Sequence, residues 1–265
     1  MAPAESLSNE WQTVDAIPPL LDDELQLWRI ELPVKPGFLE ICRSLLTVEE
    51  TTRANRRKQA EARLQFIVGR GTLRILLAAA CGLEPGAIPL ATSPGGKPEL
   101  PGVDLAFNVA HSGPTILIAL HRGGLVGVDV ETVKPSMQFA DVAKHSFTES
   151  ENQELSSISD LDQRRYAFYQ QWARKEAIAK ADGRGLRLST SSFELPLSRS
   201  QSATVEVSPL SGSGNKRFYV NDLPLGSEIA GAIAMDSAIV NMKLLMFPMH
   251  EIQKTSPLPY KMELR

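Results

Sequence analysis

The spacing of apolar residues predicts a strand near the start of the chain and a long helix after it. Residues 25–32 alternate between apolar and polar side chains, as expected for a strand with one buried face. Residues 50–80 contain no proline, and apolar residues recur there at helical spacing. Gly82 follows where a glycine commonly ends a helix. We therefore expect one strand followed by one long helix.

Two short apolar runs and a second helix are predicted further along the chain. The runs 115–120 and 125–130 are joined by His-Arg-Gly-Gly, which predicts a β-hairpin with the glycines at its turn. Helical spacing predicts a second helix over residues 161–181, ending at Gly183.

The order of these elements predicts the fold class. Short β-like runs follow the second helix, at residues 203–207, 217–220 and 228–234. The order of strands and helices is therefore duplicated, although no sequence repeat is visible. This favours an α+β fold of two similar lobes that meet near residue 125, namely residues 1–125 and 126–265.

Composition excludes several classes of protein. The chain has 265 residues and a formal net charge of −3, so no global basic field indicates a nucleic-acid partner. The N-terminus lacks the apolar core of a signal peptide, and no run reaches the ~18 apolar residues of a membrane span. Cys42 and Cys81 stand alone and are expected to be free thiols of a reducing compartment. We expect a cytoplasmic protein without a membrane partner.

The segment Gly127-Val-Asp-Val-Glu131 is the sharpest chemical signal. Side chains alternate along a strand, so Asp129 and Glu131 are predicted to share one face. Two adjacent carboxylates repel unless a cation or hydrogen-bond donors lie between them. They are therefore either a magnesium site or a solvated strand end, and the segment alone does not decide between the two interpretations.

Two further segments carry candidate chemistry. Trp172, Glu176 and Lys180 recur at four-residue steps, so they share one helix face. Glu176 and Lys180 are either a surface ion pair or a ligand and a charge beside a diphosphate. His111, followed by Ser-Gly, is either an anion contact or a structural histidine.

Order and spacing of these segments match one known family. The motifs are GKP at 96–98, FNVAHSG at 107–113, GVDVE at 127–131, and WARKEAIAK at 172–180 followed by GRGL at 183–186. Over roughly residues 25–195 the chain resembles the 4′-phosphopantetheinyl transferases of the Sfp type, which activate surfactin synthetase.

The resemblance implies both a fold and a reaction. The fold has two α/β lobes related by a pseudo-two-fold axis, with the active site in the cleft between them. The reaction transfers the 4′-phosphopantetheine arm of coenzyme A to a serine of an apo acyl or peptidyl carrier protein. It depends on Mg²⁺ and releases adenosine 3′,5′-bisphosphate. A monomer is expected, because one chain builds the whole cleft.

The resemblance also assigns catalytic and metal-binding roles. Asp129, Glu131 and Glu176 match the magnesium-binding acids, and Glu176 is also the expected base. Lys180 matches the lysine that meets the diphosphate, and Glu151 matches a further acid near the metal.

Coenzyme A contacts follow in the same way. Lys97 and His111 match groups on the nucleotide and its 3′-phosphate, and Lys175 matches a motif position assigned to the same substrate. Two residues depart from the family pattern. Ala110 replaces a serine, and Gln65 replaces an arginine. Either Arg63 or Arg70 is expected to supply the missing phosphate contact.

Two other functions fit the same residues, and one surface is a candidate for carrier docking. The chain could be a non-catalytic module that binds coenzyme A or a carrier protein, or a magnesium-dependent nucleotide pyrophosphatase. Carrier docking is expected on the apolar and basic segment 132–147, which contains Lys134, Met137, Phe139 and Lys144.

Overall fold

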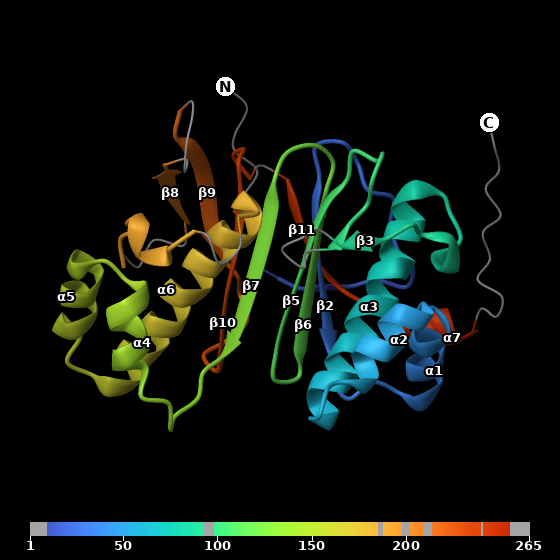
Figure 1. Cartoon of the computed structure of the whole chain (residues 1–265), viewed down its shortest axis with the longest axis horizontal. Helices are drawn as coiled ribbons and strands as arrows, with labels where there is room; N and C mark the ends of the chain where they lie inside the picture. Colours follow the sequence, from blue (N-terminus) through green and yellow to red (C-terminus); the bar gives the residue numbers. More distant parts are fainter. Residues whose placement is uncertain are drawn as a thin grey trace.

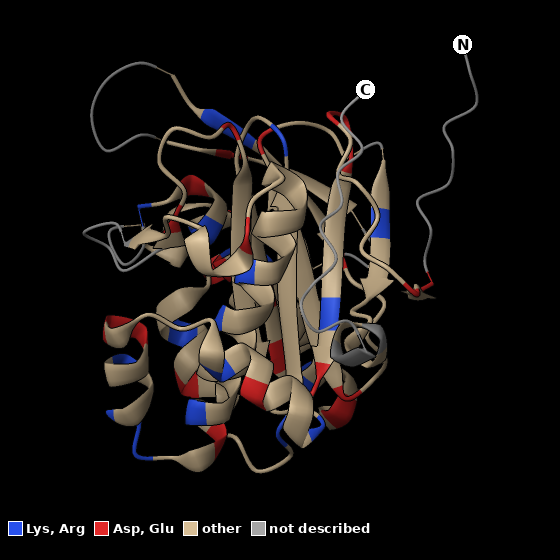
Figure 2. Cartoon of the chain, turned by 90° about the vertical axis from the view of Figure 1, so that its right-hand side faces the viewer, with Lys and Arg blue, Asp and Glu red and all other residues tan. Residues whose placement is uncertain are grey.

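The computed structural model describes residues 10–92, 98–184, 188–197, 202–208, 214–239 and 241–254. Two main sheets lie face to face, and helices cover the outer side of each, so that the molecule has four layers (Figure 1). Seen from the right-hand side of that view, the helices α1–α3 lie in front of the strands (Figure 2). The fold is therefore a mixed α+β structure.

The first sheet has five strands in the order β1-β11-β2-β6-β5. They are β1 (Gln12–Thr13), β11 (Met242–Met246), β2 (Leu25–Glu31), β6 (Thr115–His121) and β5 (Ala106–Ser112). Its outer face is covered by α1 (Pro36–Ser44), α2 (Val48–Asn55), α3 (Ala60–Cys81) and α7 (Met249–Lys254).

The second sheet has four antiparallel strands in the order β7-β10-β9-β8. They are β7 (Val126–Thr132), β10 (Ile229–Met235), β9 (Lys216–Asp222) and β8 (Ser202–Val207). Its helices are α4 (Phe139–Ser146), α5 (Glu149–Ser157) and α6 (Leu161–Asp182). Short elements complete the described structure: the strands β3 (Ala91–Thr92) and β4 (Pro98–Glu99), and the 3₁₀ turns Pro85–Ala87 and Thr190–Ser192.

Alternation along the strands divides the core into layers, as the sequence predicts. In β2, Trp28 and Ile30 pack toward the helices of the first sheet, whereas Leu25 and Leu27 pack between the two sheets. The predicted second helix is confirmed as α6, and Gly183 follows it with a φ of 82°. Each β-like run predicted after α6 overlaps one of the strands β8, β9 and β10, and only the run 228–234 begins one residue before its strand.

The predicted single helix over residues 50–80 is wrong, because the chain forms α2 and α3 with a break between them. A capping box of Thr47 and Glu50 starts α2. Glu50 then pairs with Arg70 at 3.3 Å and with Arg74 at 3.1 Å, so α2 folds back along α3. This ion-pair network is buried. Helix-forming residues continue through the break between α2 and α3, so apolar periodicity alone does not reveal it.

The predicted hairpin of 115–120 and 125–130 is also wrong. Both runs are strands, but β6 pairs with β2 and β5, whereas β7 pairs with β10. Gly123 and Gly124 have positive φ and carry the chain from one sheet to the other. Two strands joined by a short turn therefore belong to different sheets.

The predicted lobe 126–265 needs one correction. The change from the first sheet to the second occurs between β6 and β7, near the expected boundary at residue 125. However, β11 returns to the first sheet and pairs with β2 in parallel. Residues 242–246 thus belong to the layer built by the N-terminal half.

Helix α3 is long and apolar enough to cross a membrane by length and composition alone. Of its most apolar window, 67% is buried inside the protein. Phe66, Val68 and Leu76 are among its residues in the core between the first sheet and its helices. Its apolar character is therefore accounted for by packing.

Side chains, rather than a backbone ladder, join β5 to β7, the facing edge strands of the two sheets. Asn108 Oδ1 accepts the backbone N–H of Val128 at 3.0 Å, and Ser112 Oγ accepts that of Thr132 at 2.9 Å. Both bonds span 20 residues, so the two strands run in the same direction.

Close packing of α6 on β7 predicts that Gly127 tolerates no side chain. A Cβ atom at Gly127 would lie 2.1 Å from the carbonyl oxygen of Ala177 and 2.3 Å from the backbone nitrogen of Ala181. Gly127→Ala should therefore destabilise the protein by at least the ~1–3 kcal/mol typical of overpacking. Thermal unfolding measures the loss. Gly86→Ala is the control, because nothing lies within 4 Å of its Cβ position. A wild-type melting temperature for Gly127→Ala would contradict this helix–strand distance.

Candidate active site

The face of β7 that meets α6 carries the candidate acids. Val126, Val128 and Val130 point into the core between the sheets. Alternation therefore directs Gly127, Asp129 and Glu131 to the opposite face. The close approach of Gly127 to Ala177 identifies that face as the one that α6 covers. The predicted shared face of the two acids is confirmed in this way.

Asp129 is buried and paired with Lys180. Lys180 Nζ lies 2.6 Å from Asp129 Oδ1 and donates to the carbonyl oxygen of Val128 at 3.2 Å. The other carboxylate oxygen of Asp129 is buried and has no hydrogen-bond partner. Burial raises the pKa of Asp129, and Lys180 opposes that rise. One oxygen is thus held by an ammonium group, while the second is desolvated and uncompensated.

Burial and the negative charge of Asp129 raise the pKa of both other acids, Glu131 and Glu176. Burial, and then Asp129, raise the pKa of Glu131 to about 7, although a hydrogen bond from Ser112 Oγ at 3.2 Å lowers it. Burial and Asp129 also raise the pKa of Glu176, and Lys180 lowers it. The fold thus brings β7 and α6 together so that three acids and one lysine interact electrostatically.

No set of three His, Cys, Asp or Glu side chains is arranged as a metal site in the part of the chain that the structure describes. The oxygens of Asp129, Glu131 and Glu176 are nevertheless the donors that Mg²⁺ prefers. The unpartnered oxygen of Asp129 and the raised pKa values of all three acids fit a site that a cation would stabilise.

His111 lies on β5, close enough to the acidic site for the charge of Lys180 to affect its pKa. Partial burial, followed by the positive charges of Lys180 and Arg57, lowers the pKa of His111. His111 is therefore near enough to Lys180 of α6, and to Arg57 just before α3, for both charges to act on it. This arrangement brings residues of the first and second sheets into one electrostatic site.

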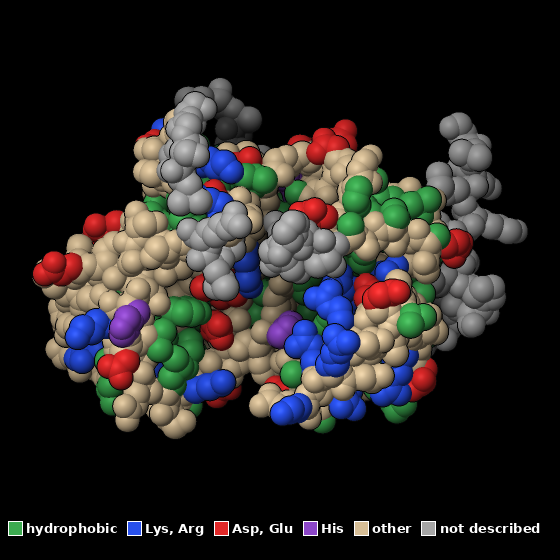
Figure 3. Space-filling view, in the orientation of Figure 1, with side chains coloured by type: hydrophobic (Ala, Val, Ile, Leu, Met, Phe, Trp, Pro, Cys, Tyr) green, Lys and Arg blue, Asp and Glu red, His purple; other side chains and the backbone are tan. Residues whose placement is uncertain are grey.

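A cluster of arginines around Phe66 supplies positive charge beside His111. The guanidinium carbons of Arg53, Arg57 and Arg70 lie 5.9, 4.8 and 5.6 Å from the centre of the Phe66 ring. Arg57 Nε is buried and has no hydrogen-bond partner. In the space-filling view, Lys and Arg side chains gather on one side of a central hollow, and acidic side chains lie across it (Figure 3).

Arg53 and Arg57 are not among the site residues predicted from the sequence, which include Arg63 and Arg70 instead. Arg70 is bound to Glu50, and the exposed Arg63 donates to the carbonyl oxygen of Arg57 at 3.1 Å. The basic run at 56–58 was a signal for this cluster, but only the break between α2 and α3 turns it toward His111.

Four other residues singled out in the sequence, Lys175, Glu151, Gln65 and Ala110, have the following surroundings in the structure. Lys175 and Glu151 form a buried ion pair with each other, at 2.8 Å. Gln65, the first departure from the family pattern, donates to the carbonyl oxygen of Gly113 at 2.7 Å, and so ties α3 to the end of β5. Ala110, the second, is buried in the core between the sheets. Lys97 lies outside the described residues.

Comparison with known proteins identifies the family. A family model described as the 4′-phosphopantetheinyl transferase superfamily matches residues 125–234. The 4′-phosphopantetheinyl transferase HetI of Nostoc sp. strain PCC 7120 is 34% identical over 194 residues, which cover 72% of this chain and 81% of HetI. The chain belongs to the 4′-phosphopantetheinyl transferase superfamily. The resemblance predicted from the motifs is confirmed.

Other relatives of this transferase carry the same name. The 4′-phosphopantetheinyl transferase Sfp of Bacillus subtilis strain 168 is 28% identical over 165 residues, covering 62% of this chain and 72% of Sfp. The 4′-phosphopantetheinyl transferase AcpT of Escherichia coli strain K12 is 37% identical over 89 residues, covering 33% of this chain and 45% of AcpT. The matched family region contains β7, α6 and most of β10, and hence the acids of the candidate site.

The raised pKa of Glu131 predicts an unusual pH dependence of stability in the transferase without metal. The folded state keeps the proton of Glu131 up to about pH 7, whereas the unfolded chain releases it near 4.5. The contribution of Glu131 to the free energy of unfolding therefore falls as pH rises from 4.5 to about 7 and levels off above that, where both states have lost the proton. Glu131→Gln should be more stable than wild type at pH 8 and equally stable at pH 4.

Urea unfolding in EDTA at the two pH values measures this difference. Glu49→Gln is the control, because Glu49 is exposed at the start of α2 and its pKa is lowered rather than raised. An equal stability difference between Glu131→Gln and wild type at both pH values would contradict the burial of this carboxyl group.

Proposed function

We propose that this transferase moves the 4′-phosphopantetheine arm of coenzyme A to a serine of an apo carrier protein and releases adenosine 3′,5′-bisphosphate. Family membership supports the reaction. The observation that supports the site assignment is the electrostatic interaction of Glu131 and Glu176 with Asp129 and Lys180, and of His111 with Lys180 and Arg57. Interacting carboxylates on one side and cationic side chains on the other suit a diphosphate that is bound together with a metal ion.

The proposal includes a cleft between two similar lobes related by a pseudo-two-fold axis. Each of the two main sheets has its own layer of helices (Figure 1), and β5 and β7 meet where the sheets face each other. Coenzyme A would bind along this junction. The transferase would act as a cytoplasmic monomer, since residues from both sheets of one chain contribute to the site.

Asp129, Glu131 and Glu176 are the residues that would hold Mg²⁺. Such an ion, when bound, supplies positive charge that neutralises the diphosphate and improves the leaving group. Lys180 then donates to the diphosphate and stabilises charge on its oxygens. In the structure Lys180 instead contacts Asp129, so its ammonium group is already held at the acids.

Glu176 is the proposed general base. Its pKa is raised by burial, so its carboxylate accepts a proton more readily than an ordinary glutamate does. It takes the proton of the carrier serine as the serine oxygen bonds to the phosphorus atom that carries the pantetheine arm. The bond from that phosphorus to the bridging oxygen of the diphosphate breaks, and the electron pair leaves with adenosine 3′,5′-bisphosphate.

The carrier protein would dock near α4. Helix α4 occupies residues 139–146 of the segment expected to dock carriers, and Lys134 and Lys144 are exposed there. Phe139 must be removed from the expected docking residues. Its ring is buried and stacks on Phe168 with 5.2 Å between the ring centres.

Mass spectrometry of a carrier protein tests the proposed function. The transferase is mixed with coenzyme A, Mg²⁺ and an apo carrier, and the carrier should gain the mass of one phosphopantetheine arm. Coenzyme A cleaved without any gain on the carrier would indicate a pyrophosphatase. Intact coenzyme A and an unmodified panel of carriers would favour a non-catalytic binding module.

Glu176→Gln tests the base within the same assay. The substitution keeps the shape of the side chain but removes its charge, so kcat should fall by at least the ~10²-fold typical of a lost general base. Binding of coenzyme A without metal should change little, and titration calorimetry in EDTA checks this. A wild-type kcat at saturating Mg²⁺ would exclude Glu176 as the base.

Arg57 is the proposed replacement for the arginine missing at Gln65. Its Nε lacks a hydrogen-bond partner, and a charge-assisted contact to phosphate contributes about 1.5–3 kcal/mol. Arg57→Ala should therefore weaken coenzyme A binding by about 10- to 100-fold while changing dephospho-coenzyme A binding little. Arg43→Ala is the control, because Arg43 is exposed on α1 and pairs with Glu40. Equal losses for both ligands would argue against a contact with the 3′-phosphate.

A further inference from the structure

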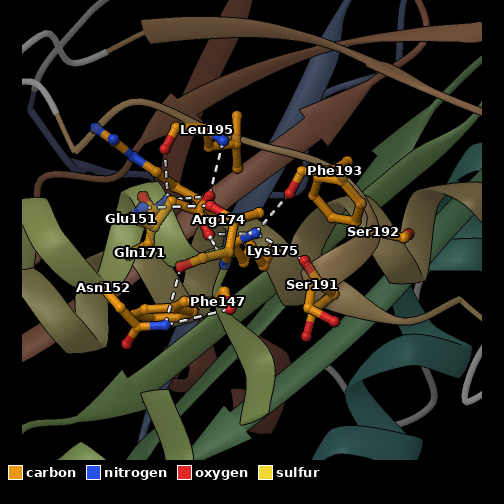
Figure 4. A network of polar contacts seen from close by, with 12 residues as sticks. Phe147, Glu151, Asn152, Gln171, Arg174, Lys175, Ser191, Ser192, Phe193 and Leu195 are labelled. Atoms are coloured by element: carbon orange, nitrogen blue, oxygen red, sulfur yellow. Dashed lines mark hydrogen bonds and ion pairs between the residues drawn. The ribbon is translucent and has the colours of Figure 1, made fainter. Parts of the chain in front are cut away.

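Lys175 and Glu151 are the centre of a buried polar network on the outer side of α6 (Figure 4). Both side chains are 1% exposed. Lys175 comes from α6 and Glu151 from α5, and the network also reaches the segment 190–195 that covers both helices. Three parts of the chain therefore meet at one ion pair.

All three N–H donors of the Lys175 ammonium group are used within the protein. Lys175 Nζ donates to the carbonyl oxygen of Thr190 at 2.7 Å and to that of Phe193 at 2.8 Å, and it pairs with Glu151 Oε2 at 2.8 Å. The centre of the Phe193 ring also lies 4.7 Å from Lys175 Nζ. An ammonium group has three donors, so none remains for a phosphate of coenzyme A.

The carboxylate of Glu151 is equally occupied. Oε2 accepts the backbone N–H of Thr148 at 2.7 Å and contacts Lys175. Oε1 accepts the backbone N–H of Leu195 at 2.8 Å and the side-chain amide of Gln171 at 2.9 Å. The two oxygens of a carboxylate have about four acceptor positions, and these four contacts fill them.

Lys175 lies on the side of α6 that faces away from the second sheet. Ala173 and Ala177 pack against the second sheet. Successive residues of a helix are about 100° apart, so Lys175 projects to the side of α6 opposite Ala177. Glu176 lies between these two directions, on the flank near β7. The helix is thus held by close packing on one side and by the ion pair on the other.

We propose that Lys175 and Glu151 are positioning residues that fix α6 against β7, and that neither contacts coenzyme A, the metal or the carrier serine. Lys175 joins the segment 190–195 to α6, and Glu151 joins both to α5. Together they hold Glu176 and Lys180 in place beside Asp129. The inference rests on the proposed function of those two residues and replaces the roles that the family resemblance suggests for Lys175 and Glu151.

Lys175→Met and Lys180→Met form the matched test. Lys175→Met leaves the Glu151 carboxylate buried without its cation, so the melting temperature should fall by on the order of 10 °C. Its dissociation constant for coenzyme A, from titration calorimetry, should stay within about twofold of wild type, because no substrate contact is lost. Its kcat should fall about tenfold or more, since small displacements of catalytic groups slow reactions. Lys180→Met should show weaker coenzyme A binding with a smaller change in melting temperature.

A double variant keeps the test decisive if Lys175→Met does not fold. In Lys175→Met/Glu151→Gln no charge is left unpaired, so its melting temperature should exceed that of Lys175→Met. A double variant no more stable than the single one would overturn the proposed anchor. So would a Lys175→Met protein with wild-type stability and coenzyme A binding as weak as that of Lys180→Met. Both measurements need no carrier protein, so they stand apart from the carrier assay, whose failure would instead sink the proposed function.

Discussion

The candidate site depends on a strand-to-strand contact that side chains make in place of backbone groups. Asn108 and Ser112 of β5 each accept one backbone N–H of β7, so one side chain stands between the two strands at both positions. Such bonds satisfy edge N–H groups that burial would otherwise leave costly. Ser112 also donates to Glu131, so the contact that joins the sheets orients one of the acids.

Charge in the site is balanced only in part. Asp129, Glu131 and Glu176 all have raised pKa values, and burial is the first cause for each. Lys180 compensates one oxygen of Asp129, and the other has no partner. By comparison, the ion pair of Lys175 and Glu151 is fully compensated, because every donor of Lys175 and every acceptor position of Glu151 has a partner within the protein. Incomplete compensation is what a site needs if a cation and an anionic substrate are to bind there.

The two long helices contribute to the site in different ways. Helix α6 supplies Glu176 and Lys180 directly, and small residues let it approach β7 closely. Helix α3 supplies Phe66, around which the arginines gather, and it holds α2 through Glu50. One helix therefore carries reactive groups, whereas the other arranges positive charge that comes from the chain before it.

The local features of this protein follow from its sequence. The alternation in β7, the four-residue steps in α6 and the motif order were sufficient to predict the shared face of Asp129 and Glu131, the helix with Glu176, and the family. Which elements pair with one another became clear from the three-dimensional structure. It separated β6 from β7, folded α2 back on α3, and returned β11 to the first sheet. It also buried Lys175, which the motif alone could not distinguish from a substrate ligand. The physical reason is that a periodic pattern shows which face of an element is apolar, whereas the partner that covers this face comes from residues distant in the chain.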